Sequence, residues 1–140
     1  MSNAMELFKA ERQRQINVEG WTPGHDDEHA DGEMMRAAMI YLHHGTDKQA
    51  DTANGVPIGW PWSIEWWKPK DRRSNLIRAG ALMLAERERI VRAHDKRRRL
   101  ECAPRGLARN HRPKIWPAAP VGHIDHKLAL AEKYLNELQL

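Results

Sequence analysis

Apolar residues recur at helical spacing in three long stretches of this chain, residues 5–18, 31–44 and 71–100. No stretch alternates between apolar and polar residues over a useful length, as a half-buried strand would. The second stretch is apolar nearly all round between residues 34 and 42, which predicts a central helix. Gly80 interrupts the third. Because glycine inside a helix costs about 1 kcal/mol relative to alanine, we expect close helix contact there.

The ends of these stretches carry residues that start or stop helices. Gly20 and Gly45 are placed to end the first and second helices, since glycine adopts the left-handed conformation of a helix C-terminus. Thr22 and Pro23 are suited to begin a short helical turn. Asp31 is suited to begin the second long helix, and Asp71 or Ser74 the third.

The last apolar seam lies near the C-terminus. Its residues are spaced 4, 3, 4 and 3 apart, as in a heptad repeat: Ile124, Leu128, Ala131, Leu135 and Leu138. Two heptads are too short to stand alone in water. The seam therefore docks on the core, on a partner, or on a second copy, in which case a homodimer would form through Ile124, Leu128, Leu135 and Leu138.

These patterns predict an all-α fold of about four helices. They form a small bundle with a Trp-rich crossover loop and a separate C-terminal amphipathic helix. We expect a helical domain over residues 5–100, a Pro-rich linker over 101–122 and a docking or dimerisation helix over 123–140. Residues 1–4 resemble an expression scar.

The crossover loop holds the densest chemistry of the chain. Four of the six tryptophans lie within residues 60–67, and the loop continues to Lys70; we call residues 60–70 the Trp loop. Trp62, Trp66 and Trp67 are candidate stacking residues for a planar ligand. The alternative is that indoles fill the core, which we expect for at least two of the four, with at most one of Trp66 and Trp67 fully buried. Cations near the start of the following helix suit phosphate: Lys68, Lys70, Arg72 and Arg73.

A strongly basic segment follows. Residues 87–114 carry eleven Lys or Arg and three acids, a net charge of +8 in a chain whose total is +4. Such a concentration of positive charge favours a phosphate-bearing partner. The candidate nucleic-acid contacts spread around a helix and would bind phosphate without reading sequence: Arg92, Lys96, Arg97, Arg98 and Arg99. The alternative is a solvated helix end.

A cluster of histidines and acids suggests a divalent metal. His25, His29 and Glu33 share one face if their helix is continuous, and Asp26 adds a carboxylate. Imidazole with carboxylate suits zinc, manganese or iron. The alternative is an acidic helix start, where carboxylates favour the helix dipole.

The composition indicates the cellular compartment. The single cysteine, Cys102, makes no intrachain disulfide, in agreement with a reducing compartment. No apolar run approaches the roughly 20 residues that cross a bilayer. We therefore expect a cytoplasmic protein without membrane contact.

Two blocks of sequence resemble a small protein family common in bacteriophage and prophage genomes. The first holds ERQRQ (11–15), EGWTP (19–23) and HDDEHADGE (25–33), and the second holds WPWSIEWWKPKDRR (60–73) and AGALMLAE (79–86). The resemblance covers roughly residues 6–92. It implies a phage or prophage protein in a bacterial host, and it implies no particular activity.

A second similarity is to the all-α MazG-like nucleoside triphosphate pyrophosphohydrolases. Glu33 resembles the start of their first magnesium-binding acidic helix, and Glu86 part of the second. Arg36 and Arg89 stand where that family has acids, and magnesium needs several carboxylate oxygens.

Three hypotheses follow from these patterns. The leading one is a phage-type accessory protein that binds a phosphorylated ligand, either nucleic acid or nucleotide. The second is a metal-dependent pyrophosphohydrolase that uses His25, Asp26, His29, Glu33 and Glu86. The third is a protein–protein interaction module built on the C-terminal seam.

Overall fold

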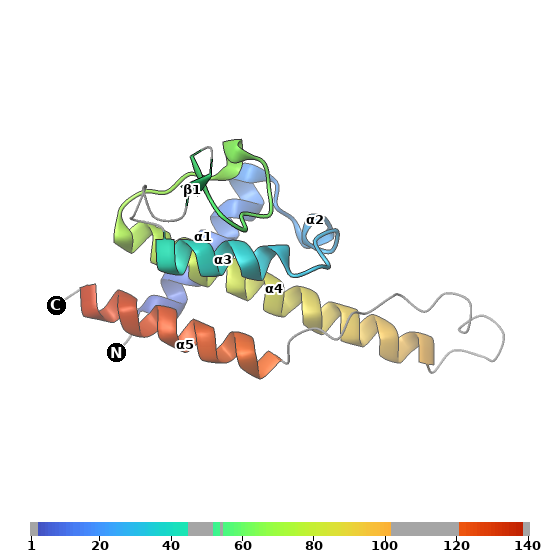
Figure 1. The fold of residues 1–140 in the computed structure, drawn as a ribbon. Coiled ribbons are helices and arrows are strands. Elements are labelled where there is room, and N and C mark those ends of the chain that lie inside the picture. Colours follow the sequence, from blue (N-terminus) through green and yellow to red (C-terminus); the bar gives the residue numbers. More distant parts are fainter. Residues whose placement is uncertain (1–2, 45–51, 54, 102–120, 139–140) are drawn as a thin grey trace.

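The computed structural model describes residues 3–44, 52–53, 55–101 and 121–138. It is mostly helical, in agreement with the predicted all-α class (Figure 1). Its elements in chain order are α1 (Ala4–Glu19), α2 (Pro23–Asp26), α3 (Glu33–His44), β1 (Thr52–Ala53), β2 (Val56–Pro57), the 3-10 helix η1 (Ile64–Trp66), α4 (Arg72–Glu101) and α5 (Val121–Leu138).

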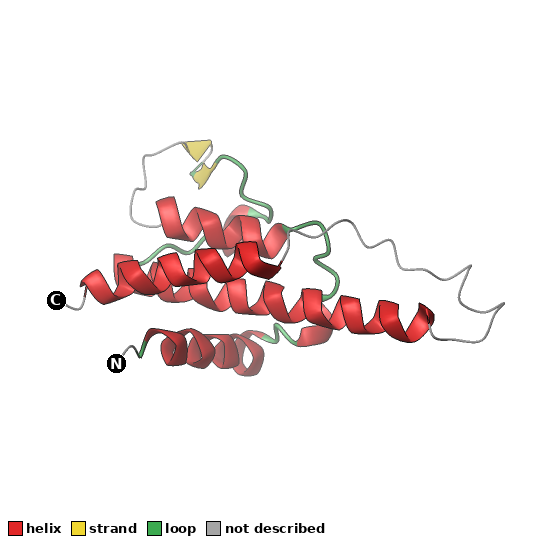
Figure 2. Cartoon of the chain, turned by 90° about the horizontal axis from the view of Figure 1, so that it is seen from below, coloured by secondary structure: helices red, strands yellow, loops and turns green. Residues whose placement is uncertain are grey.

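The crossover between α3 and α4 contains a feature that the sequence pattern did not predict. β1 and β2 form a two-residue antiparallel ladder in which Ala53 pairs with Val56 (Figure 2). The Trp loop follows this ladder and returns over α3 to the start of α4. The predicted crossover loop is therefore confirmed, with a small hairpin before it.

The helix at the centre of the bundle is α4. The three other long helices, α1, α3 and α5, all contact it (Figure 1). We expected α3 to be central because it is apolar nearly all round. Instead it lies between α4 on one side and the Trp loop on the other, and this loop accounts for its second buried face. None of the described helices is long and apolar enough to span a bilayer.

The crossing of α1 and α4 depends on Gly80. A Cβ added to Gly80 would overlap the ring of Phe8, which is fully buried. The close helix contact expected at this glycine is confirmed. This close contact packs α1 directly against α4.

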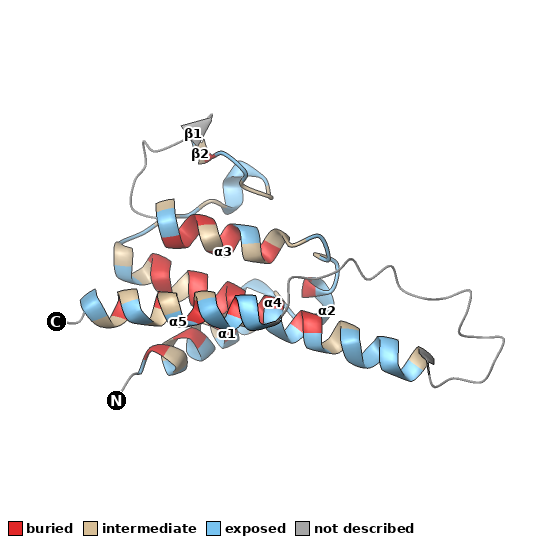
Figure 3. Cartoon of the chain, turned by 60° about the horizontal axis from the view of Figure 1, so that its bottom comes forward, coloured by how far each residue is buried: buried red, intermediate tan, exposed pale blue. Residues whose placement is uncertain are grey.

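The C-terminal seam docks on the chain's own core. Ile124, Leu128 and Leu135 are buried against the bundle, while Leu138 is 50% exposed (Figure 3). This is the first of the three options that the heptad spacing left open. A homodimer through this seam would require these side chains to leave α4.

The helix α5 begins at Val121, and α4 ends at Glu101. The predicted linker of residues 101–122 is therefore helical at both ends, and the rest of it lies outside the described residues.

Most predicted helix ends are confirmed. Gly20 has a φ of 76° and ends α1, and the Thr22 hydroxyl accepts a hydrogen bond from His25 N at 3.3 Å. Asp31 was expected to open α3, but the helix begins at Glu33, whose carboxylate accepts a hydrogen bond from the Asp31 amide at 3.0 Å. Gly45 lies outside the described residues.

Ala4, assigned above to an expression scar, is the first residue of α1 and is buried.

Asp71 caps α4. Its carboxylate accepts hydrogen bonds from the Ser74 amide at 2.8 Å and the Ser74 hydroxyl at 3.0 Å. Hydrogen bonds from Ser74 lower the pKa of Asp71 below its ordinary value. The cap therefore stabilises the fold above the unfolded pKa and loses this contribution as the pH falls through the folded pKa.

Replacing Asp71 by alanine should lower the Tm by a few degrees at pH 7, because two donors at the helix start lose their acceptor. The difference from the wild-type protein should shrink below about pH 4 as the cap becomes protonated in both states. Asp95→Ala, a change at an exposed position of the same helix, is the control in thermal unfolding. An Asp71 variant as stable as the control would show that the cap does not matter.

Candidate ligand-binding pocket

A pocket of about 340 Å³ opens where α1, α2, the Trp loop and α4 meet. Its lining residues come from five parts of the chain, which only the fold brings together: α1 and α2, each with the turn that follows it, α3, the Trp loop and α4. They are Arg12, Gln15, Glu19, Gly20, Trp21, His25, Asp26, His29, Met34, Trp62, Ser63, Trp66, Leu82 and Ala85. We call this cavity the indole pocket.

Aromatic rings form the walls of the indole pocket. The centroid of the Trp21 ring lies 6.3 Å from that of Trp62 and 5.9 Å from that of Trp66. The imidazole of His29 meets Trp62 edge-on, with 5.4 Å between centroids. Trp66 is 44% exposed, so it stands at the mouth. Leu82 and Ala85 of α4 supply an apolar floor. The indoles contact one another at interplanar angles of 52° and 59°, so the pocket presents ring surfaces to a ligand and not two parallel walls.

The other tryptophans of the Trp loop pack against the core. Trp67 lies 4.8 Å from Tyr41 and 5.0 Å from Trp60, measured between ring centroids, and both indoles contact the hydrophobic core. Of the three predicted stacking residues, Trp66 lines the pocket, Trp67 packs against the core, and Trp62 does both. Trp66 and Trp67 do point differently, and neither is fully buried.

A buried ion pair fixes the base of the pocket. The Arg12 guanidinium donates a hydrogen bond to the Asp26 carboxylate, and a second to the Trp21 carbonyl at 2.9 Å. Both side chains of the pair are about 95% buried, with 5% and 4% exposed. Burial raises the pKa of Asp26, while the charges of Arg12, His25 and Arg92 partly oppose this rise. The pair ties α1 to α2 and holds Trp21 in place.

The predicted metal residues contact one another in pairs, and Asp26 is held by an arginine. Asp26 faces Arg12, and His29 Nδ1 lies 3.1 Å from Glu33 Oε2. His25 is partly exposed and stacks edge-on with His29. Within the described part of the chain, no three His, Cys, Asp or Glu side chains gather in a way that would hold a metal ion. Glu86 is paired with Arg89 at 2.7 Å.

Three polar atoms of the pocket residues have no hydrogen-bond partner. They are Arg12 Nε, Gln15 Oε1 and Trp62 Nε1, and all three are shielded from solvent. An unsatisfied buried donor or acceptor costs about 1–3 kcal/mol. Arg12 and Gln15 are themselves 4% and 3% exposed. Arg12 Nε lies 3.6 Å from the Glu88 carboxylate. Because solvent does not reach these three atoms, they belong to the packed wall behind the cavity and not to its open surface.

The predicted phosphate-binding cations are only partly available. The Asp71 carboxylate already occupies the start of α4. Arg72 donates a hydrogen bond to the Leu42 carbonyl at 2.6 Å. The backbone amide of Lys70 donates to Asn75 Oδ1 at 2.8 Å, and the Lys70 side chain is exposed. Arg73 is exposed. Lys68 differs, because its ammonium lies 5.5 Å from the centroid of the Trp66 ring, at the mouth of the pocket.

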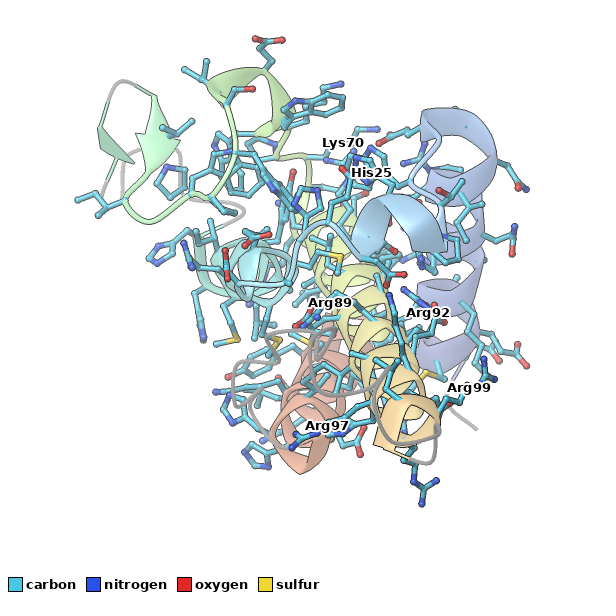
Figure 4. All side chains as sticks on the ribbon, turned by 90° about the vertical axis from the view of Figure 1, so that its right-hand side faces the viewer. His25, Lys70, Arg89, Arg92, Arg97 and Arg99 are labelled. Atoms are coloured by element: carbon cyan, nitrogen blue, oxygen red, sulfur yellow. The ribbon has the colours of Figure 1, made fainter. Side chains whose placement is uncertain are left out.

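The basic end of α4 projects beyond the bundle (Figure 3). Arg92 pairs with Asp27 at 2.9 Å and so helps to hold α2. Lys96, Arg98 and Arg99 are exposed, and Figure 4 shows Arg97 and Arg99 leaving α4 on different sides. The predicted nucleic-acid contacts therefore form a cationic helix end away from the indole pocket.

Sequence reasoning missed nine of the pocket residues, and the most informative of these are Arg12, Gln15 and Trp21. Trp21 was interpreted only as part of a turn. Arg12 and Gln15 are polar, yet they occupy the buried face of α1. This explains why the apolar stripe of residues 5–18 is loose, and that looseness was the available signal.

A scan against protein-family models, a search of curated proteins and a search of solved structures find no match to the chain. The fold and the pocket define a small helical protein with an aromatic-walled cavity.

Proposed function

We propose that this chain is a phage-type accessory protein that binds a phosphorylated ligand, a nucleotide or a single-stranded nucleic acid, with one base in the indole pocket. The observation that carries the proposal is an indole-lined pocket with the Lys68 ammonium at its mouth. Apolar ligand pockets with a few convergent polar groups bind small molecules, and about 300 Å³ is the lower end of their size range.

Stacking supplies the main attraction in this proposal. A base would lie against the indoles that line the pocket, and each base–aromatic stack is worth about 1–3 kcal/mol. The carboxylates of Glu19 and Asp26 line the same cavity. Each is paired with an arginine, Asp26 with Arg12 and Glu19 with Arg14 at 3.1 Å. The proposal therefore places the neutral base in the cavity and the phosphate outside it.

The phosphate would lie toward Lys68. A smaller hollow adjoins the indole pocket, shares Trp21, Trp62 and Trp66 with it, and is lined in addition by Lys68, Arg14 and Arg78. A phosphate attached to a base in the pocket would meet this cationic side. A longer strand would also reach the basic end of α4, where the contacts would be electrostatic.

Trp66→Ala should weaken the binding of nucleoside monophosphates about tenfold or more, because one stacking surface is lost. Isothermal titration calorimetry measures this directly. Ile64→Ala is the matched control: Ile64 belongs to the same 3-10 helix and is 53% exposed, but it does not line the pocket. Equal affinities for wild-type protein and the Trp66 variant would refute the proposed site.

The affinity for a short single-stranded oligonucleotide should fall steeply with salt, because phosphate contacts release counterions. The variant Lys96→Ala/Arg98→Ala/Arg99→Ala should reduce the slope of log K against log salt. Neutralising Lys9 and Lys133, which are exposed on α1 and α5, is the control. Binding that does not change between 50 and about 200 mM salt would exclude the nucleic-acid form of the proposal.

A further inference from the structure

The carboxylates beside the indole pocket are only partly neutralised by their arginine partners. Two ion-pair networks flank the cavity, and in each of them one guanidinium lies within 3.6 Å of two carboxylates. They are Asp26–Arg12–Glu88 and Glu19–Arg14–Glu11. Four carboxylates and two guanidinium groups leave a net charge of −2 beside the pocket, although the whole chain carries +4. This local charge favours a positively charged occupant over a neutral one.

The other charged groups around the pocket do not reverse this sign. Arg89 and Arg92, on the neighbouring turns of α4, are each paired with a carboxylate and add no net charge. The two histidines of the lining are counted as neutral at pH 7, and Glu33, at 3.1 Å from one of them, adds a negative charge. Lys68 stands at the mouth of the pocket, where the proposed function puts the phosphate.

The inclination of the indole rings also favours a charged base. Trp62 and Trp66 are tilted by 52° and 59° from Trp21, so one flat base cannot stack face to face on all three rings. The attraction between a cation and an aromatic face does not require parallel planes, because a charge interacts with the ring quadrupole over about 6 Å. Trp66 already contacts a cation in this way, since the Lys68 ammonium lies 5.5 Å from its centroid. Inclined indoles can therefore contribute together to the binding of one positive charge.

We propose that the indole pocket prefers a nucleotide whose base carries a positive charge on its ring, an inference that rests on the proposed function. Methylation of a ring nitrogen produces such a base: in nucleotides of 1-methyladenine and 3-methylcytosine the ring is a cation at neutral pH. The indoles and the net negative charge beside them attract the ring. Lys68 and Arg78 of the adjoining hollow attract the phosphate. The site thus has a negative and a positive end, which match the two ends of the ligand.

Calorimetric titration of the full chain with AMP, 1-methyl-AMP and N6-methyl-AMP at pH 7 tests the inference. The two methylated nucleotides differ only in the position of the methyl group, and only 1-methyl-AMP has a cationic ring. We expect 1-methyl-AMP to bind about tenfold or more tightly than AMP, and N6-methyl-AMP to bind like AMP. Equal affinities for the three, or a preference for a neutral base, would overturn the charge preference and leave the proposed function in place. Binding of none would overturn both.

A variant of the lining tests the origin of the preference. Glu19→Gln removes one carboxylate and keeps the size of the side chain. It should reduce the affinity for 1-methyl-AMP about threefold or more and leave the affinity for AMP unchanged. Glu28→Gln is the matched control, because Glu28 is exposed and lines neither cavity. An equal loss for AMP and 1-methyl-AMP in Glu19→Gln would contradict a role of charge.

Glu88→Gln is a second variant in case Glu19→Gln does not fold. Glu88 lies outside the lining and its side chain is 50% exposed, so this change alters the net charge without altering the contact surface. It should lower the affinity for 1-methyl-AMP in the same direction, and an unchanged affinity would count against the charge preference. A short oligonucleotide that contains one 1-methyladenine, titrated in parallel, distinguishes a strand from a free nucleotide as the source of the base.

Discussion

Replacing Arg12 by methionine is expected to lower the free energy of unfolding by about 3–5 kcal/mol at pH 7, because it leaves the Asp26 carboxylate buried without its partner. Arg12 also donates to the Trp21 carbonyl, so the turn between α1 and α2 loses a second contact. Urea denaturation followed by circular dichroism measures the change. Arg92→Met is the matched control. Its ion pair with Asp27 is largely exposed, and such pairs contribute about 0–1 kcal/mol.

The decrease in the free energy of unfolding caused by Arg12→Met should depend on pH. Burial already raises the pKa of Asp26 above the ordinary 3.8, and removal of the Arg12 charge raises it further. A folded state that holds a proton more tightly than the unfolded chain is stabilised as the pH falls through the folded pKa. The penalty should therefore shrink at acidic pH, and Arg12→Met/Asp26→Asn should recover much of it at pH 7. If the loss of stability in Arg12→Met is the same at every pH, the buried Asp26 carboxylate is not its cause.

Gly80→Ala is expected to destabilise the protein by about 2 kcal/mol, although alanine is the better helix former by about 1 kcal/mol. The new methyl group would overlap the Phe8 ring, which is fully buried and has little space to move. The change in the urea midpoint, with an unchanged m value, measures this effect.

Gly122→Ala is the control for the Gly80 variant. It lies in the first turn of α5, its φ is not in the left-handed region, and an added Cβ there meets nothing within 4 Å. We expect no loss of stability from this change. A stabilised Gly80→Ala variant would mean that α1 moves away from α4 without cost.

Much of the fold could be predicted because it follows from local chemistry. Helix spacing, the Thr22 cap, the left-handed Gly20 and the Asp71 cap each act within a few residues. The central position of α4 could not be predicted, because the sequence does not show that the Trp loop covers the second apolar face of α3. The docking of the C-terminal seam was one of three options, since an apolar seam does not specify its partner.

The candidate site was only half predictable. Trp62 and Trp66 were evident from the density of indoles, and their neighbour Trp67 was assigned to the same role although it packs on Tyr41. The histidine–aspartate motif suggested a metal because its spacing matches ligand spacing. Whether Asp26 pairs with an arginine from another helix depends on a contact between residues 14 positions apart, and spacing alone does not encode such a contact.

The most direct measurement of the central claim is the nuclear magnetic resonance spectrum of the indole N–H groups during a titration with CMP. The chain has six tryptophans, so the spectrum contains few signals, and single Trp→Phe variants assign them. We predict that the signals of Trp62, Trp66 and Trp21 shift in proportion to occupancy while that of Trp67 remains nearly in place. Unchanged Trp62 and Trp66 signals at saturating nucleotide would contradict a base-binding indole pocket.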